Sequence, residues 1–129
     1  MARYNASLDR ALNAEQKSRA LFLSLLTKRQ KDFFDKVGYV QVQGGKTRNV
    51  YNIFPGYSQN IRGRLTFNQL ARVTKKDGPP CACPDCTRDR DHVICYHMRI
   101  GAPLWDHMAA QVLYIRFAEE VLLDEAYIS

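Results

Sequence analysis

Long apolar runs are absent from this sequence, since no segment approaches the ~20 consecutive apolar residues needed to cross a bilayer. The densest apolar segment, Leu21 to Leu26, is too short for a signal peptide, lies too far from the start and is flanked by basic residues. We therefore expect a cytoplasmic protein without membrane contact. In that reducing compartment, clustered cysteines bind metal or perform redox chemistry more often than they form disulfides.

The sequence also lacks the signatures of the common catalytic classes. It contains no nucleophile elbow, no Gly-rich phosphate cradle and no paired carboxylates in a plausible cleft. The segment Gly44-Gly45-Lys46-Thr47 does not have the glycine spacing of a P-loop, so we interpret it as a turn. These absences predict that the protein is not an enzyme.

The chain carries more positive than negative side chains, and the excess is distributed unevenly along the sequence. The formal charge is +6; residues 1–100 hold 18 Lys and Arg against 8 Asp and Glu, whereas the remaining 29 residues hold one Arg against five acids. A basic body of this kind attracts phosphate backbones or acidic protein surfaces. It is equally compatible with a well-solvated surface that has no such partner.

The length and the periodicity predict one α+β domain over residues 1–129, with a helical N-terminal segment over residues 1–36. The cap-like pair Asn13 and Gln16 predicts a helix from about Ala14 to Leu26. The clearer pair Thr27 and Gln30 predicts a second helix over residues 28–36, which stops at Gly38.

After residue 38 the pattern of apolar residues changes from a helical period to a period of two residues. Residues 39–43 and 50–53 alternate around the turn, which predicts a β-hairpin, and residues 61–67 and 70–73 predict one or two further strands of a small antiparallel sheet. Pro103 starts a C-terminal helix that runs to about Glu125. Residues 37–126 are thus expected to form a β-β-α unit around a Cys/His loop.

All four cysteines and two of the three histidines, His92 and His97, lie within the 17 positions from Cys81 to His97. Zinc in structural sites takes four ligands from thiolate sulfur and imidazole nitrogen. Residues at i and i+2 of an extended strand point to the same face, so Cys81 and Cys83 can offer two ligands and Cys95 and His97 the other two. This is the first ligand set for a Zn2+ ion.

A second ligand set remains open because Cys83-Pro84-Asp85-Cys86 is also a good zinc knuckle. Cys86 is then the alternate ligand, and the set becomes Cys83, Cys86 and Cys95 with His97 or Cys81. A thioredoxin-like redox pair at Cys83 and Cys86 is disfavoured, because the chain offers no strand-then-helix context for it. His92 is interpreted as a solvent-facing loop residue.

The spacing resembles the SWIM-type zinc finger, whose pattern is Cys-x-Cys, a spacer and Cys-x-His, often with Pro-Asp after the second cysteine. The resemblance implies a zinc-binding module, commonly part of a larger protein, that binds nucleic acid or protein partners. Cys86 is an additional thiol, and Tyr96 stands where the family commonly has Lys or Arg.

A weaker likeness is to small uncharacterised bacterial and phage-encoded domains. These have a Thr-x-x-Gln helix start, a Gly-Tyr strand, a Cys-x-His element and an Ala-Gln pair in the last helix, here at residues 27–30, 38–39, 95–97 and 110–111. This likeness implies no activity, but it supports treating residues 27–126 as one unit.

A closed four-ligand zinc site contributes folding free energy rather than catalysis, so the leading hypothesis is a non-catalytic nucleic-acid-binding module, for DNA or RNA. Tyr51, Tyr57 and Tyr96 are candidates to stack on bases. The candidate phosphate-binding residues are Arg62, Arg64, Arg72, Lys75, Lys76, Arg88, Arg90 and Arg99.

The alternative hypothesis is a zinc-stabilised protein-interaction or structural subunit of phage or bacterial type. In it the long first helix docks on a partner protein, because Leu21 to Leu26 with Phe22 exceed what one helix face needs.

Overall fold

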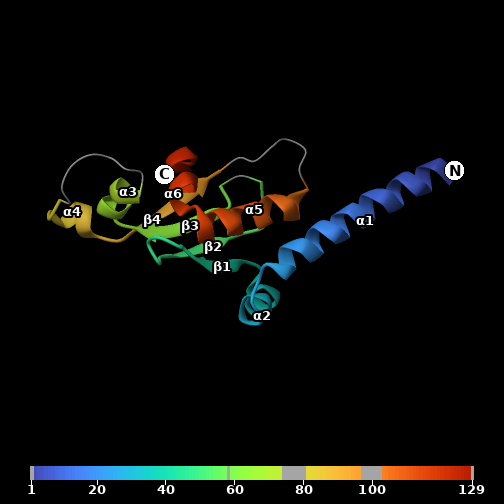
Figure 1. Ribbon diagram of the computed structural model, residues 1–129, viewed down its shortest axis with the longest axis horizontal. Helices are drawn as coiled ribbons and strands as arrows, with labels where there is room; N and C mark the ends of the chain where they lie inside the picture. Colours follow the sequence, from blue (N-terminus) through green and yellow to red (C-terminus); the bar gives the residue numbers. More distant parts are fainter. Residues whose placement is uncertain (1, 58, 74–80, 97–102, 129) are drawn as a thin grey trace.

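The computed structural model describes residues 2–57, 59–73, 81–96 and 103–128. Within these residues the chain is an α+β protein with six helices and a five-stranded antiparallel sheet, which confirms the predicted fold class (Figure 1). The helices are α1 (Ala2–Ser24), α2 (Lys28–Val37), α3 (Phe67–Val73), α4 (Pro84–Thr87), α5 (Leu104–Phe117) and α6 (Glu119–Glu125). The strands are β1 (Val40–Gln43), β2 (Val50–Ile53), β3 (Ile61–Leu65), β4 (Arg90–Cys95) and β5 (Tyr127–Ile128).

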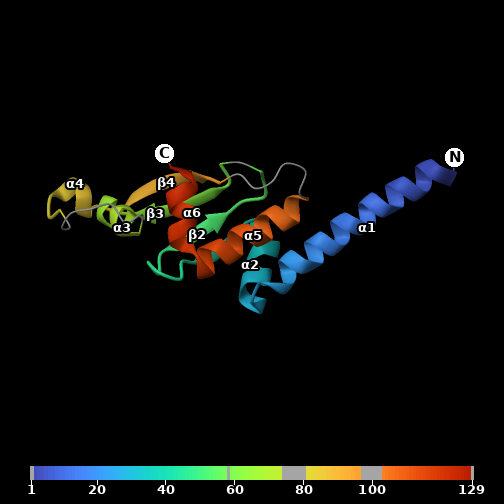
Figure 2. The ribbon, with the colours of Figure 1, turned by 45° about the horizontal axis from the view of Figure 1, so that its top comes forward.

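Helix α1 is continuous and projects from the body of the protein (Figures 1 and 2). The predicted start at Ala14 is therefore wrong, because Asn13 lies inside the helix. The preceding residues include Ala2, Ala6 and Ala11, and alanine has the highest helix propensity, so the helix extends past the cap-like pair. None of the helices in the described residues has the length and apolar character that crossing a membrane requires.

Helix α2 begins and ends where its capping residues predict. The Thr27 hydroxyl accepts from the Gln30 N–H at 3.2 Å, and the Gln30 side chain accepts from the Thr27 N–H at 2.9 Å. Gly38 ends the helix in the left-handed region at a φ of 82°, and its N–H donates to the Phe34 carbonyl at 2.8 Å. The predicted range of residues 28–36 is thus confirmed to within one residue.

The strands pair antiparallel in sequence order, from β1 at one edge to β5 at the other. Alternate side chains are buried against α5 and its neighbours, whereas the others remain exposed, so the sheet has one covered face and one open face. The core side chains of the strands are Val40, Val42, Tyr51, Ile53, Ile61, Leu65 and Ile94. They pack with helix residues that include Phe22, Met108, Val112, Ile115 and Leu122.

Three segments differ from the sequence-based expectation. Residues 70–73 belong to helix α3 and not to a strand, because Thr66 and Gln69 form the same reciprocal cap as Thr27 and Gln30, at 2.9 and 3.0 Å. The spacer after Cys83, expected to be a loop, contains α4 and β4. The C-terminal helix is divided at Ala118, which has a φ of −146°.

The break at Ala118 places Glu119 under the β1–β2 turn. The Glu119 carboxylate is 1% exposed and accepts hydrogen bonds from the Lys46 N–H at 2.9 Å, the Thr47 N–H at 2.8 Å and the Thr47 hydroxyl at 2.6 Å. The Tyr51 hydroxyl donates to the same carboxylate, and burial together with this contact raises the pKa of Tyr51 well above its usual value. A Cβ atom at Gly44 would overlap the carboxylate, so this turn requires glycine there.

We expect Glu119→Ala to lower the free energy of unfolding by about 3 kcal/mol, because it leaves several buried donors without an acceptor. Urea denaturation measures this loss. Asp124→Ala removes an exposed acid from the same helix and should change stability by less than about 0.5 kcal/mol. Equal losses in the two variants would contradict the structural role of Glu119.

Candidate metal centre and basic surface

A group of three cysteine sulfurs lies beside helices α3 and α4, at the end of the molecule opposite the N-terminus of α1 (Figure 1). The Sγ atoms of Cys81, Cys83 and Cys86 are all within 4.8 Å of one another. Cys83 caps α4, and the N–H groups of Cys86 and Thr87 each donate to its carbonyl at 3.2 Å. This single turn, started by Pro84 at the first helical position, brings Cys83 and Cys86 to the same side.

Cys81 is positioned by Asn68 of α3. The Asn68 side-chain amide donates to the Cys81 carbonyl at 2.5 Å, and its Oδ1 accepts from the Cys81 N–H at 3.0 Å. Both backbone hydrogen-bonding groups of Cys81 are therefore held by one side chain. Asn68 is a positioning residue that sequence reasoning missed, because nothing in the spacing links α3 to the cysteines.

The three thiols form one hydrogen-bonded group around Cys83. Hydrogen bonds from the thiols of Cys81 and Cys86, and then from the backbone N–H groups of Cys86 and Asp85, hold the pKa of Cys83 below its usual value. Donation to Cys83 and Cys81 raises the pKa of Cys86 to about 12. Convergent thiol groups of this kind suit a thiophilic cation such as zinc, which replaces the thiol protons.

The donor set fits zinc in type, and three of the four ligands of a tetrahedral site are accounted for within this group. None of the four cysteines is in a disulfide. In the described part of the chain the group contains three donors, so a tetrahedral ion would take its fourth ligand from outside it.

Cys95 is not a member of this three-sulfur group, although both ligand sets expected from the sequence include it. Cys95 is the last residue of β4, opposite Tyr127, whereas α4 precedes the first residue of that strand. A strand rises about 3.3 Å per residue, so the strand carries Cys95 about 16 Å beyond Arg90. His97, the remaining expected ligand, lies outside the described residues.

Strand β4 also corrects the interpretation of His92. Its ring is 7% exposed, contacts the carbonyl of Leu65 at 3.3 Å through Nε2 and lies against the Phe67 ring. Asp91 and His92 are polar and Val93 and Ile94 are apolar, so these residues show no alternation that would have predicted the strand. Sequence reasoning missed it because the metal motif was read as one loop.

Two of the arginines proposed to bind phosphate have acidic partners. Arg90 approaches Asp85 at 3.3 Å and lies over the Phe67 ring at 4.6 Å, and Arg64 approaches Asp91 at 3.3 Å. Arg88 is exposed beside them. The side chain of Arg72 is not described, and Lys75, Lys76 and Arg99 lie outside the described residues. Positive charge beside the cysteines is thus partly neutralised.

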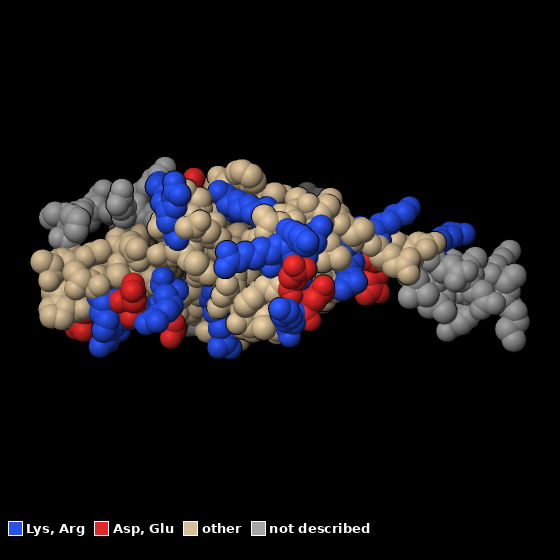
Figure 3. Space-filling view, turned by 90° about the horizontal axis from the view of Figure 1, so that it is seen from below, with Lys and Arg blue, Asp and Glu red and all other residues tan. Residues whose placement is uncertain are grey.

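The open face of the sheet carries a different set of side chains. The β-pairing aligns Gln41 with Asn52 and Asn52 with Arg62, which gives a row of exposed or partly exposed polar groups across β1, β2 and β3. Arg64 lies two residues further along β3 on the same face. Figure 3 shows Lys and Arg side chains recurring along the body of the molecule, with acidic groups among them.

The three tyrosines proposed for stacking have different environments. Tyr51 is completely buried, so its assignment as a base-stacking residue is wrong. Tyr96 packs on Tyr114 with ring centroids 5.3 Å apart and donates to Glu125 at 3.1 Å. Tyr57 is 58% exposed and contacts the His107 ring.

No protein-family model, curated protein or solved structure matches this chain. The likeness to the SWIM-type zinc finger therefore stays a prediction from the quoted residues, and the functional argument depends on the geometry of the chain itself.

We expect the purified chain to bind about one zinc ion, and Cys86→Ser to lose most of it because the variant removes one of three convergent sulfurs. Cys95→Ser is the matched control and should retain the zinc content of the unmodified chain. Metal analysis after gel filtration gives both values. Loss of zinc from Cys95→Ser would show that Cys95 is a ligand and would contradict the three-sulfur assignment.

Proposed function

We propose that this protein is a non-catalytic, zinc-binding module that binds nucleic acid through the open face of its sheet. The observation that carries the proposal is the absence of acidic residues between Asp35 and Asp77, a stretch with eight Lys and Arg. Strands β1, β2 and β3 all come from this stretch. Their open face therefore presents Arg62 and Arg64 beside uncharged amide side chains, and only Arg64 has an acidic partner there, Asp91 of the next strand. This surface suits a polyanion.

In this proposal the zinc ion has a structural role. It would link Cys81, which Asn68 holds to α3, with Cys83 and Cys86 of α4. Helix α3 follows β3, and α4 precedes β4. The ion would therefore cross-link the two helices of the connection between these paired strands. Metal binding of this kind contributes directly to folding free energy.

We expect Arg62→Gln combined with Arg64→Gln to weaken binding to mixed-sequence DNA or RNA at 50 mM salt by about tenfold or more, because two phosphate contacts are removed. The slope of log affinity against log salt should fall by about 2. Fluorescence anisotropy on labelled oligonucleotides measures both quantities.

The matched control combines Arg10→Gln with Lys17→Gln, which removes the same charge from exposed positions of α1. It should keep the affinity within about threefold. Absence of binding at 50 mM salt, or equal losses in the two double variants, would reject nucleic acid as the ligand of the open face.

One observation favours the second candidate, a protein-interaction subunit. Phe117, at the end of α5, is 79% exposed, and Leu113 one turn earlier is 40% exposed. The surplus of exposed apolar side chains expected on α1 is smaller than the sequence suggests, since Phe22 and Leu26 are buried and Leu21 is exposed. Concentration-dependent self-association that Phe117→Ser abolishes, together with no nucleic-acid binding, would favour this candidate.

A further inference from the structure

An aromatic cluster borders the open face of the sheet where α2 meets β1. Tyr39 precedes β1 and Phe54 follows β2, so alternation places both rings on the side of Gln41 and Asn52. The Tyr39 and Phe54 ring centroids are 4.7 Å apart with an interplanar angle of 32°, and Phe33 of α2 meets Tyr39 edge-on at 5.3 Å. All three side chains are partly exposed. The face thus carries stacked aromatic rings that solvent reaches.

A cation lies directly over this cluster. The guanidinium carbon of Arg62 is 5.6 Å from the centroid of the Phe54 ring, within the range of a cation–π contact. Arg62 therefore joins the aromatic cluster to the row of polar groups across the sheet. A planar group placed here meets both a π surface and a fixed positive charge.

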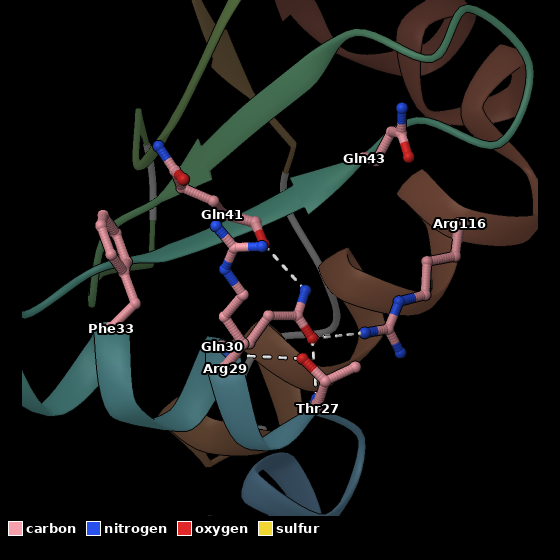
Figure 4. A pocket seen from close by; sticks show the side chains of 7 residues that line it. All are labelled: Thr27, Arg29, Gln30, Phe33, Gln41, Gln43 and Arg116. Carbon is pink, nitrogen blue, oxygen red and sulfur yellow. Dashed lines mark hydrogen bonds between the residues drawn. The ribbon is translucent and has the colours of Figure 1, made fainter.

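Two hollows meet beside the cluster at Gln41. The first, of about 520 Å³, lies between the start of α2, β1 and the end of α5, and its lining includes Arg29, Phe33 and Arg116 (Figure 4). The second, of about 360 Å³, lies over β2 and β3 and is lined in part by Asn52, Arg62 and Arg64. Gln41 lines both, so the two hollows adjoin at this residue on the edge of the sheet, and together they are called the path.

The first hollow is rigidly built. The Arg116 guanidinium donates to the Leu25 carbonyl at 2.6 Å and to the Gln30 side chain at 2.9 Å. Gln30 in turn donates to the Gln41 carbonyl at 2.8 Å, so α5, α2 and β1 are tied together at this point, as Figure 4 shows. The positive charge of Arg116 is therefore fixed before any ligand arrives, which lowers the entropic cost of binding.

The charges along the path are complementary to a chain of phosphates. Arg29 and Arg116 line one end, and Arg62 and Arg64 line the other. Asp89 and Asp91 close the far end, where Asp91 pairs with Arg64. A polyanion is thus favoured from α2 as far as β3 and disfavoured beyond it, towards the cysteine group.

We propose that this path binds a single strand of nucleic acid, with bases stacked on the cluster of Phe33, Tyr39 and Phe54 and phosphates on Arg29 and Arg62. The inference depends on the proposed function and names its substrate class. A duplex presents phosphates but keeps its base faces stacked internally, so it cannot use the aromatic rings. The exposed Gln41 supplies an amide donor and an acceptor for base edges.

The experiment compares a 15-nucleotide single strand with its duplex, at equal salt, for the full-length chain. We expect the single strand to bind at least about tenfold more tightly. Tyr39→Leu with Phe54→Leu keeps apolar volume but removes both π surfaces, and should weaken single-strand binding about tenfold without changing the salt dependence. Tyr127→Leu changes an exposed aromatic residue of β5 that lines neither hollow; it is the control and should bind as the unmodified chain does.

A second variant guards against a folding defect in the aromatic double variant. Arg29→Gln changes an exposed residue of α2 and should weaken single-strand binding about threefold, with an unchanged melting temperature. If single strand and duplex bind equally, or if the aromatic and Arg29 variants bind normally while Arg62 and Arg64 variants do not, this inference is wrong and the proposed function stands. If neither form binds at 50 mM salt, both are wrong.

Discussion

The fold depends on one buried carboxylate, that of Glu119, which joins the hairpin of β1 and β2 to the break between α5 and α6. Its oxygens accept from two backbone N–H groups and two hydroxyls. These hydrogen bonds offset the cost of burying a carboxyl group in the core. This contact holds the end of α5 against the hairpin, where the Gly45 N–H also donates to the Ile115 carbonyl at 3.0 Å. Helices therefore cover one face of the sheet, and the other face remains open.

The same contact explains why the acidic end of the chain does not neutralise the basic body. Four of the five acids that follow residue 100 lie in α6, but Glu119 is used internally and Glu125 accepts from the Tyr96 hydroxyl. The acids are thus fixed in a helix near the covered face, and they are not a mobile tail. On the opposite face, Arg62 lies over the Phe54 ring, whereas Arg64 pairs with Asp91 of β4.

Local interactions were predictable from the sequence, whereas non-local ones were not. The Thr27–Gln30 cap, the Gly38 stop and the hairpin each depend on residues close together in the chain, and each was predicted. The Thr66–Gln69 cap obeys the same rule and should have indicated α3. The three-sulfur group was predicted only as part of a cluster, because which sulfurs lie together depends on β4 pairing with β3 over a sequence separation that spacing does not encode.

The direction of β4 connects the group of Cys81, Cys83 and Cys86 to the open face of the sheet. Strand β4 starts beside α4 and pairs with β3 from Leu65 opposite Arg90 to Ile61 opposite Ile94. Its first residues are therefore those nearest the three-sulfur group. Arg90 contacts Asp85 of α4 and the Phe67 ring of α3, so the strand start is tied to both helices. A metal ion on Cys81, Cys83 and Cys86 would tighten this junction and thereby fix the register of β3, which carries Arg62 and Arg64. In the proposed function, zinc thus acts on nucleic-acid binding through the position of a strand rather than by contact with the ligand.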